Sequence, residues 1–232
     1  MHAERLATLI KSLFPPDVAT EAAATDEARG RLHPQEEDWI TRATPKRSRE
    51  FTAGRICARR ALARLGINDY PLLPGPDRVP VWPADVVGSI SHTEGFCGVA
   101  VTRRTPSTGI GLDIESAEGL DEQQWPLVLR ASERHWLGRV DARERDRLAK
   151  LMFSVKECAY KCQYCVHRRW LEFSDVEVVL DLDRGEFIAN ILKALDPHSG
   201  PHTLNGRFLL EGDWVLTGSL VVFTNAAIDG NE

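Results

Sequence analysis

The segment Gly109–Glu115 constrains the fold most strongly, because apolar side chains occupy every second position of it. In a β-strand this alternation places the apolar side chains on one face and Asp113 and Glu115 on the other. Two carboxylates side by side repel each other unless a cation lies between them. A hard divalent cation with oxygen ligands suits that position. The sequence therefore predicts a strand with an acidic, cation-binding face.

A long amphipathic helix is predicted for residues 142–166. Its polar stripe follows the intervals i, i+4, i+7 and i+11, and contains Glu157 and Lys161. Its apolar stripe contains Cys162. Taken singly, each of these charges is better explained as part of a solvated surface. Their joint spacing with Asp113 and Glu115 favours a shared site in which the helix supplies a third carboxylate and an ammonium group.

The remaining pattern indicates an α+β fold in which each half is a helix followed by an antiparallel β-meander. A further amphipathic helix is indicated at the N-terminus, around residues 6–14. The expected helices are residues 46–65, 126–137 and 142–166, and the expected strands are residues 86–91, 96–102, 109–115, 176–182, 187–192, 207–210 and 214–223.

Composition excludes several classes of protein. The 232 residues are 43% hydrophobic and 27% charged, as in an ordinary globular protein. A net charge of -5 argues against nucleic acid as a partner. No segment approaches the roughly 20 apolar residues that a membrane-spanning helix needs, so no stable membrane insertion is expected. Five cysteines, an odd number, fit a reducing cytoplasm better than a disulfide framework.

Four segments, in order, resemble motifs of the Sfp-type 4′-phosphopantetheinyl transferases, and more closely the enterobactin synthase component D-like subgroup that serves siderophore synthetases. They are residues 46–55, 81–92, 109–115 (G-I-G-L-D-I-E) and 153–161 (F-S-V-K-E-C-A-Y-K). The resemblance implies two similar α+β lobes related by a pseudo-twofold axis, with the active site in the cleft between them. The lobes would be residues 1–107 and 108–232.

The resemblance also implies the reaction. A monomer would transfer 4′-phosphopantetheine from coenzyme A, its substrate, to a serine of an apo peptidyl or acyl carrier protein, and release adenosine 3′,5′-bisphosphate. Peptidyl carriers of siderophore and nonribosomal peptide synthesis are expected from the subgroup. Mg²⁺, with Mn²⁺ as an alternative, would be held by Asp113, Glu115 and Glu157.

The implied roles of individual residues follow from the same resemblance. Glu157 is the candidate general base, acting directly or through a metal-bound water, and Lys161 neutralises charge on the transferred phosphate. Some members carry a lysine in the loop before Trp82, which this chain lacks; Arg78 is the nearest cation. The implied coenzyme A contacts are Arg47, Arg55, Ser91, His92, Lys156 and Lys161.

Two other interpretations remain. Cys158, Cys162 and Cys165 have the C-x3-C-x-aromatic-C spacing with which radical S-adenosylmethionine enzymes hold an iron–sulfur cluster. The context disagrees, because only 67 residues follow Cys165 and they have the pattern of short strands. A non-catalytic nucleic-acid-binding module, using the Arg-rich residues 46–64, conflicts with the acidic balance.

The segment between the two acidic motifs, residues 118–137, is a candidate docking surface for the carrier protein. This expectation depends on its position and on Leu120 and Trp125, which we expect to be exposed.

Overall fold

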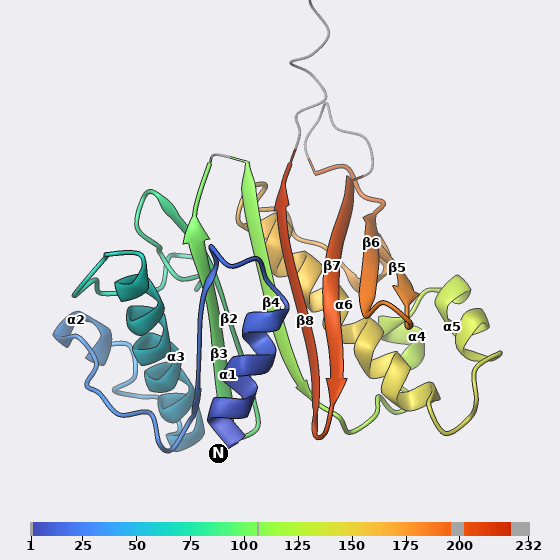
Figure 1. Ribbon diagram of the computed structural model, residues 1–232, viewed down its shortest axis with the longest axis horizontal. Helices are drawn as coiled ribbons and strands as arrows, with labels where there is room; N and C mark the ends of the chain where they lie inside the picture. The colour runs from blue at the N-terminus through green and yellow to red at the C-terminus, as the bar shows by residue number, and fades with distance from the viewer. Residues whose placement is uncertain (1, 106, 196–201, 224–232) are drawn as a thin grey trace, which may run out of the picture. The chain divides into compact units, whose positions relative to one another are not determined.

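The computed structural model describes residues 2–105, 107–195 and 202–223 (Figure 1). The chain divides into two compact units, Met1–Thr105 and Pro106–Glu232. Each unit contains an antiparallel sheet packed with helices. The predicted α+β class is therefore confirmed.

Unit 1 is built around one long helix on a small sheet with strand order β1-β3-β2. The helix begins after Thr44, whose hydroxyl oxygen accepts a hydrogen bond from the Arg47 amide at 3.3 Å, as an N-cap does. Small buried side chains such as Ala58 and Ala61 face the sheet and allow close packing. The elements are α1 (His2–Ser12), β1 (Ala19–Ala24), α2 (Pro34–Glu37), α3 (Pro45–Arg64), β2 (Val86–Thr93) and β3 (Phe96–Arg103).

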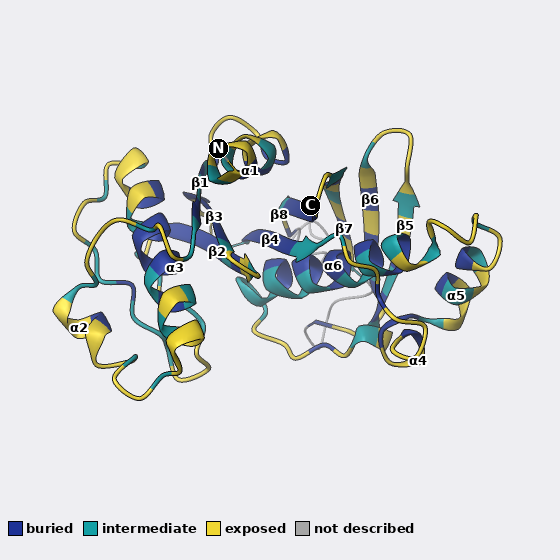
Figure 2. Ribbon diagram, turned by 90° about the horizontal axis from the view of Figure 1, so that it is seen from below, coloured by how far each residue is buried: buried dark blue, intermediate teal, exposed yellow. Residues whose placement is uncertain are grey.

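Unit 2 has a larger sheet with strand order β4-β8-β7-β6-β5, and its longest helix, α6, packs on β4 and β8 (Figures 1 and 2). The apolar stripe of α6 is buried, as its spacing predicts. The elements are β4 (Thr108–Ser116), α4 (Trp125–Val128), α5 (Ala131–Leu137), α6 (Arg145–Tyr164), the 3₁₀ helix η1 (Phe173–Asp175), β5 (Val176–Asp181), β6 (Glu186–Ile191), β7 (His202–Glu211) and β8 (Trp214–Val222).

The segment predicted as one helix over residues 126–137 differs from expectation. It forms two short helices, α4 and α5, because the backbone is extended at Leu129 and Arg130. Leu120 and Trp125, expected to be exposed, are buried, and the Trp125 indole donates a hydrogen bond to the Leu120 carbonyl at 2.9 Å. Leu127, with 77% of its surface accessible, is a large apolar side chain that this segment presents outward.

Two elements of unit 1 have no counterpart among the expected ones. Strand β1 is largely alanine, a residue that is uncommon in strands, and it forms through antiparallel pairing with β3. Helix α2 is a single turn. Among the described helices, none combines the length and apolar character that crossing a membrane requires.

Candidate active site

Two glycines bring strand β4 close to helix α6. A Cβ atom added at Gly111 would lie 2.2 Å from the Cys158 carbonyl oxygen, and one added at Gly109 would lie 2.5 Å from the Cys162 carbonyl oxygen. Both distances are far below van der Waals contact, so any larger residue would force the strand and the helix apart. The glycines thus allow the backbone contact that places Asp113 against the polar side of α6.

Asp113 is buried and bonded to α6 through both carboxylate oxygens. Lys161 Nζ donates to Asp113 Oδ1 at 2.6 Å, and Ser154 Oγ donates to Asp113 Oδ2 at 2.8 Å. Lys161 also donates to the Leu112 carbonyl at 3.2 Å. Thr217 on β8 is the neighbour of Asp113 on the adjacent strand, and its Oγ1 atom lies 2.9 Å from Ser154 Oγ. Residues from β4, α6 and β8 therefore form one polar cluster inside unit 2.

The other two predicted metal ligands lie within electrostatic reach of Asp113. Burial raises the pKa of Glu115, and the negative charge of Asp113 raises it further. Burial also raises the pKa of Glu157; there the nearby Lys161 ammonium opposes the effect and the Asp113 charge adds to it. Lys150 partly compensates Glu115, with 3.5 Å between Nζ and Oε2. The structure thus places Glu115 and Glu157 where the negative charge of Asp113 disfavours their own ionised forms.

The carboxylates of this cluster are not placed so that they could together coordinate one metal ion. Within the described ranges, no three His, Cys, Asp or Glu side chains are placed to hold one metal ion. Lys161, in contact with Asp113, supplies positive charge there instead. Burial alone lowers the pKa of the Lys161 ammonium, but the ion pair and hydrogen bond with Asp113, together with the charge of Glu157, outweigh burial and raise it. The type of ligand atom nevertheless suits a hard cation, because Asp113, Glu115 and Glu157 all offer carboxylate oxygens.

In unit 1, two of the predicted coenzyme A contacts lie together. Arg47 at the start of α3 and His92 on β2 approach to 3.4 Å between Nη1 and Nε2. Glu50 lies within 3.7 Å of Arg47 and 3.9 Å of His92. Both predicted contacts are accessible, with 58% of the Arg47 side chain and 40% of the His92 side chain exposed. An exposed guanidinium beside an imidazole can bind a phosphate group.

Ser91 and Arg55 lie elsewhere in unit 1. Because side chains alternate along a strand, Ser91 is on the face of β2 opposite to His92, and it is buried. Arg55 is only 6% exposed; its Nε donates to the Leu72 carbonyl at 2.6 Å, and its guanidinium lies 4.1 Å from the centre of the Phe51 ring. Burial lowers the pKa of Arg55 to about 10. These contacts are those of a packing residue, which differs from the expected phosphate contact.

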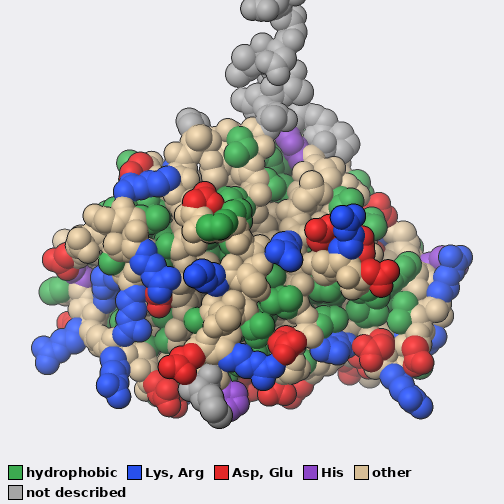
Figure 3. Space-filling model, viewed as in Figure 1, with side chains coloured by type: hydrophobic (Ala, Val, Ile, Leu, Met, Phe, Trp, Pro, Cys, Tyr) green, Lys and Arg blue, Asp and Glu red, His purple; other side chains and the backbone are tan. Residues whose placement is uncertain are grey.

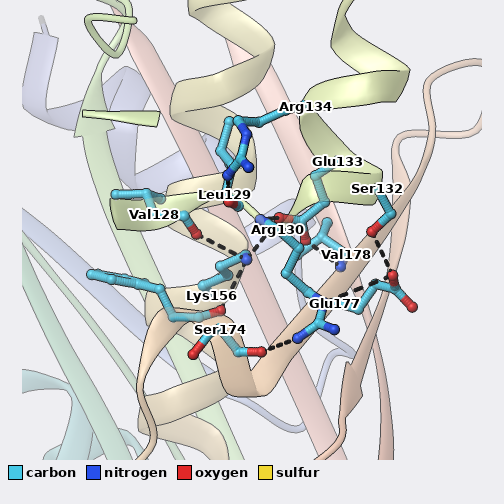
Figure 4. A network of polar contacts seen from close by, with 11 residues as sticks. Val128, Leu129, Arg130, Ser132, Glu133, Arg134, Lys156, Ser174, Glu177 and Val178 are labelled. Carbon is cyan, nitrogen blue, oxygen red and sulfur yellow. Dashed lines mark hydrogen bonds and ion pairs between the residues drawn. The ribbon is translucent and has the colours of Figure 1, made fainter. Parts of the chain in front are cut away.

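Lys156 also differs from expectation (Figure 4). The ammonium has three donors, and they bond Glu133 Oε2 at 2.8 Å and the carbonyl oxygens of Val128 and Phe173 at 3.0 Å each. The side chain is 1% exposed. Burial lowers the pKa of Lys156, and the charge of Glu133 opposes that effect. Since every donor is already bonded within the protein, Lys156 has none left for coenzyme A.

A cavity of about 350 Å³ beside Glu157 was not anticipated from the sequence. Helix α6 forms one wall, through Lys156, Glu157 and Tyr160, and residues 170–176 form the other. Tyr160 meets the Trp170 ring edge to face, with 5.7 Å between the ring centres. Only the aromatic content of these two separate segments hints at such a cavity, and no local pattern predicts it.

The cysteine motif does not form a cluster site. Cys158 and Cys162 lie fully buried at the contact of α6 with β4, and burial raises the pKa of Cys158 to about 12. The thiolate form that binds iron is therefore disfavoured at Cys158. The nucleic-acid interpretation is weakened by pairing within unit 1: Lys and Arg side chains predominate over α3 (Figure 3), but several of them are already bonded to other parts of this unit. Arg60 and Arg64 there bond the Arg29 carbonyl and Glu21.

Comparison with known protein families covers both units. Residues 35–102 match the 4′-phosphopantetheinyl transferase N-terminal domain, and residues 109–217 match the 4′-phosphopantetheinyl transferase superfamily. A solved holo-[acyl-carrier-protein] synthase of Thermotoga maritima aligns with 48% of the chain at a TM-score of 0.36 and 20% identity, a similarity too low to bear on function.

Curated relatives agree with the family matches. The chain is 39% identical to the 4′-phosphopantetheinyl transferase Svp of Streptomyces mobaraensis over 92% of this chain and 87% of that protein. It is 33% identical to PptT of Mycobacterium tuberculosis over 90% of this chain and 96% of that one. Enterobactin synthase component D of Escherichia coli O157:H7 is 38% identical, but only over 53% of this chain and 57% of that protein. The chain therefore belongs to the 4′-phosphopantetheinyl transferases, and it transfers 4′-phosphopantetheine from coenzyme A to carrier proteins.

Proposed function

We propose that the transfer takes place beside Asp113, Glu115, Glu157 and Lys161, and that the serine of the carrier protein is deprotonated there. One observation carries this proposal. Asp113 on β4 lies within electrostatic reach of Glu115 and Glu157, and Glu157 on α6 lines a cavity that is open to a substrate. Phosphoryl-type transfer needs charge neutralisation and in-line placement more than covalent help from the protein.

Asp113, Glu115 and Glu157 are the proposed ligands of Mg²⁺, with Mn²⁺ as a substitute. Bound Mg²⁺ supplies charge neutralisation on the pyrophosphate of coenzyme A. The raised pKa values of Glu115 and Glu157 support this, because a cation offsets both the cost of burying these carboxylates, which is the main cause, and their repulsion by Asp113. Lys161 is the proposed second catalytic cation, since its ammonium already lies against Asp113.

Glu157 is the proposed general base, either directly or through a water molecule. A carboxylate with a raised pKa is a better base near neutral pH than an ordinary glutamate. Metal ligation lowers its basicity, so the two routes remain alternatives. The position of Glu157 on the wall of the cavity supports either one.

The substrate is proposed to bind through both units. Arg47 and His92 are the proposed contacts for the phosphates at the nucleotide end, because they are exposed and adjacent. The cavity beside Glu157 is the proposed site of the pantetheine arm, a slender chain of apolar and amide groups that suits walls formed by Tyr160, Leu171 and Phe173. The buried Arg55, Ser91 and Lys156 are then positioning or packing residues.

Peptidyl carriers of siderophore and nonribosomal peptide synthesis are the proposed acceptors, and acyl carriers are the alternative. The partial similarity to enterobactin synthase component D supports the first. All the proposed site residues belong to one chain, so a monomer is sufficient for the reaction. All five cysteines are free thiols, which supports a cytoplasmic location.

Intact-protein mass spectrometry tests the proposal. An apo peptidyl carrier domain incubated with coenzyme A, Mg²⁺ and the enzyme should gain the mass of one phosphopantetheine group. The same domain with its acceptor serine replaced by alanine is the control and should gain nothing. A gain that persists when a chelator removes divalent cations would contradict the metal proposal, and modification of acyl carriers alone would contradict the proposed acceptor.

A further inference from the structure

Glu133, which no sequence motif singled out, is buried at the start of α5 and is fully bonded there (Figure 4). Its Oε2 accepts hydrogen bonds from the Arg130 amide at 2.7 Å and from Lys156 Nζ at 2.8 Å. Its Oε1 accepts one from the Val178 amide at 2.8 Å. The carboxylate therefore ties α5 to strand β5 on one side and to helix α6 on the other.

Lys156 extends these bonds to the wall of the cavity. Its bond to the Phe173 carbonyl joins α6 to η1, and its bond to the Val128 carbonyl joins α6 to the end of α4. Phe173 and Val176 line the cavity opposite Glu157. The Lys156–Phe173 bond thus spans the two walls, and the Glu133–Val178 bond fixes the strand that continues from Val176.

A buried ion pair is an inefficient way to stabilise a fold. The cost of removing two charges from water offsets most of their attraction, and well-packed apolar side chains often stabilise a protein as much or more. What the charged pair adds is directional hydrogen bonding to particular main-chain groups, namely the carbonyls that Lys156 bonds and the amides that Glu133 bonds. One of those groups, the Phe173 carbonyl, belongs to the wall of the cavity, and Lys156 directly precedes Glu157 in the helix.

We propose that Glu133 is a positioning residue of the transfer reaction. Acting through Lys156, it holds residues 170–176 at a fixed distance from α6, so that the pantetheine arm enters the cavity in line with Glu157. This inference rests on the proposed function, because it takes the cavity as the site of the arm.

The variant Glu133→Gln tests the proposal, because it keeps the side-chain size but removes the charge that holds Lys156. With Mg²⁺ present, calorimetry should show coenzyme A bound about tenfold more weakly, whereas adenosine 3′,5′-bisphosphate, which lacks the arm, should bind as it does to the wild type. The matched control is Glu177→Gln, which removes a nearby carboxylate that bonds Ser132 on the surface and should change neither affinity. Equal weakening of both ligands, or of neither, would overturn the proposal.

The double variant Glu133→Gln with Lys156→Met separates an effect on positioning from an effect on stability. It also allows the same measurements to be made if the single variant does not fold. Removing both charges leaves no unpaired one, so its unfolding temperature should recover towards that of the wild type. Coenzyme A affinity and kcat should stay low, because a methionine at position 156 cannot donate the bond to the Phe173 carbonyl that Lys156 provides. Recovery of kcat together with stability would overturn the proposal. Failure of the wild type to modify any carrier would instead contradict the proposed function.

Discussion

Compared with each other, the long helices of the two units divide their cations in the same way. On α3, Arg47 is exposed next to His92, whereas Arg55 is buried and bonded to the Leu72 carbonyl. On α6, Lys161 reaches Asp113, whereas Lys156 is directed to the opposite side, towards Glu133. One cation of each helix can thus serve the substrate while the other positions the surrounding chain. The resemblance assigned all four to coenzyme A, so burial is what separates the two roles.

The largest effect should come from the buried cation of unit 2. Lys156→Met leaves Glu133 buried and unpaired, so the free energy of unfolding should fall by about 3 to 5 kcal/mol. Urea titration measures it. Lys161→Met, whose side chain is 25% exposed, should destabilise the protein less but reduce kcat more. Equal losses of stability in the two variants would contradict the different roles assigned to Lys156 and Lys161.

Asp113→Asn should affect the reaction next most strongly. It removes a proposed metal charge and the partner of Lys161 while keeping the side-chain volume. The barrier should rise by about 3 kcal/mol, on the order of a hundredfold in rate. Because Asp113 is buried and bonded to Ser154, some loss of stability should accompany it. Rates are to be measured on protein shown by circular dichroism to be folded; near-normal turnover in excess Mg²⁺ would rule Asp113 out as a ligand.

The cations of unit 1 should divide in the same manner. Arg55→Met removes a charged hydrogen bond from the interior and should cost about 1.5 to 3 kcal/mol of stability, with little change in substrate preference. Arg47→Ala should leave stability unchanged and weaken coenzyme A binding by at most about fivefold, as expected of an exposed charge. Dephospho-coenzyme A, which lacks the 3′-phosphate, provides the measurement. If the preference for coenzyme A over dephospho-coenzyme A is lost in the Arg55 variant but kept in the Arg47 variant, then Arg55, and not Arg47, contacts the 3′-phosphate.

The smallest effect on activity should come from the three cysteines in and directly after α6. Replacing Cys158, Cys162 and Cys165 with alanine should cost about 1 to 2 kcal/mol of stability through lost packing. Carrier modification by the folded variant should continue, since no thiolate takes part. Loss of transfer in a folded triple variant, together with its retention in Glu157→Gln, would argue for cysteine chemistry instead.

Sequence alone predicts the parts of this protein that have a regular local pattern. Strand β4 and helix α6 follow from alternation and helical spacing, and the motif glycines 109 and 111 lie where the two backbones meet. Strand β1 escaped prediction because it depends on its partner β3 rather than on its alanine-rich composition.

At the candidate site, too, only some of the features could be predicted from the sequence. Helix geometry separates Lys156 from Lys161 by about 140° around the axis, a hint that they face different partners. It does not say which of the two is buried. The role of Glu133 and the cavity arise from segments that are distant in sequence, α5, α6 and residues 170–176, so no local spacing could have revealed them.

The glycine contact between β4 and α6 has a consequence for how the site tolerates change. Side-chain contacts adapt by changing rotamer, whereas two backbones already touching have no such freedom. At Gly111 the neighbour is the Cys158 carbonyl itself. The separation between Asp113 and Lys161 is therefore determined by the thickness of the main chain. Substitutions among the surrounding apolar side chains should leave it unaltered, while a single added methyl group at position 111 should change the reach of every charged group in the cluster.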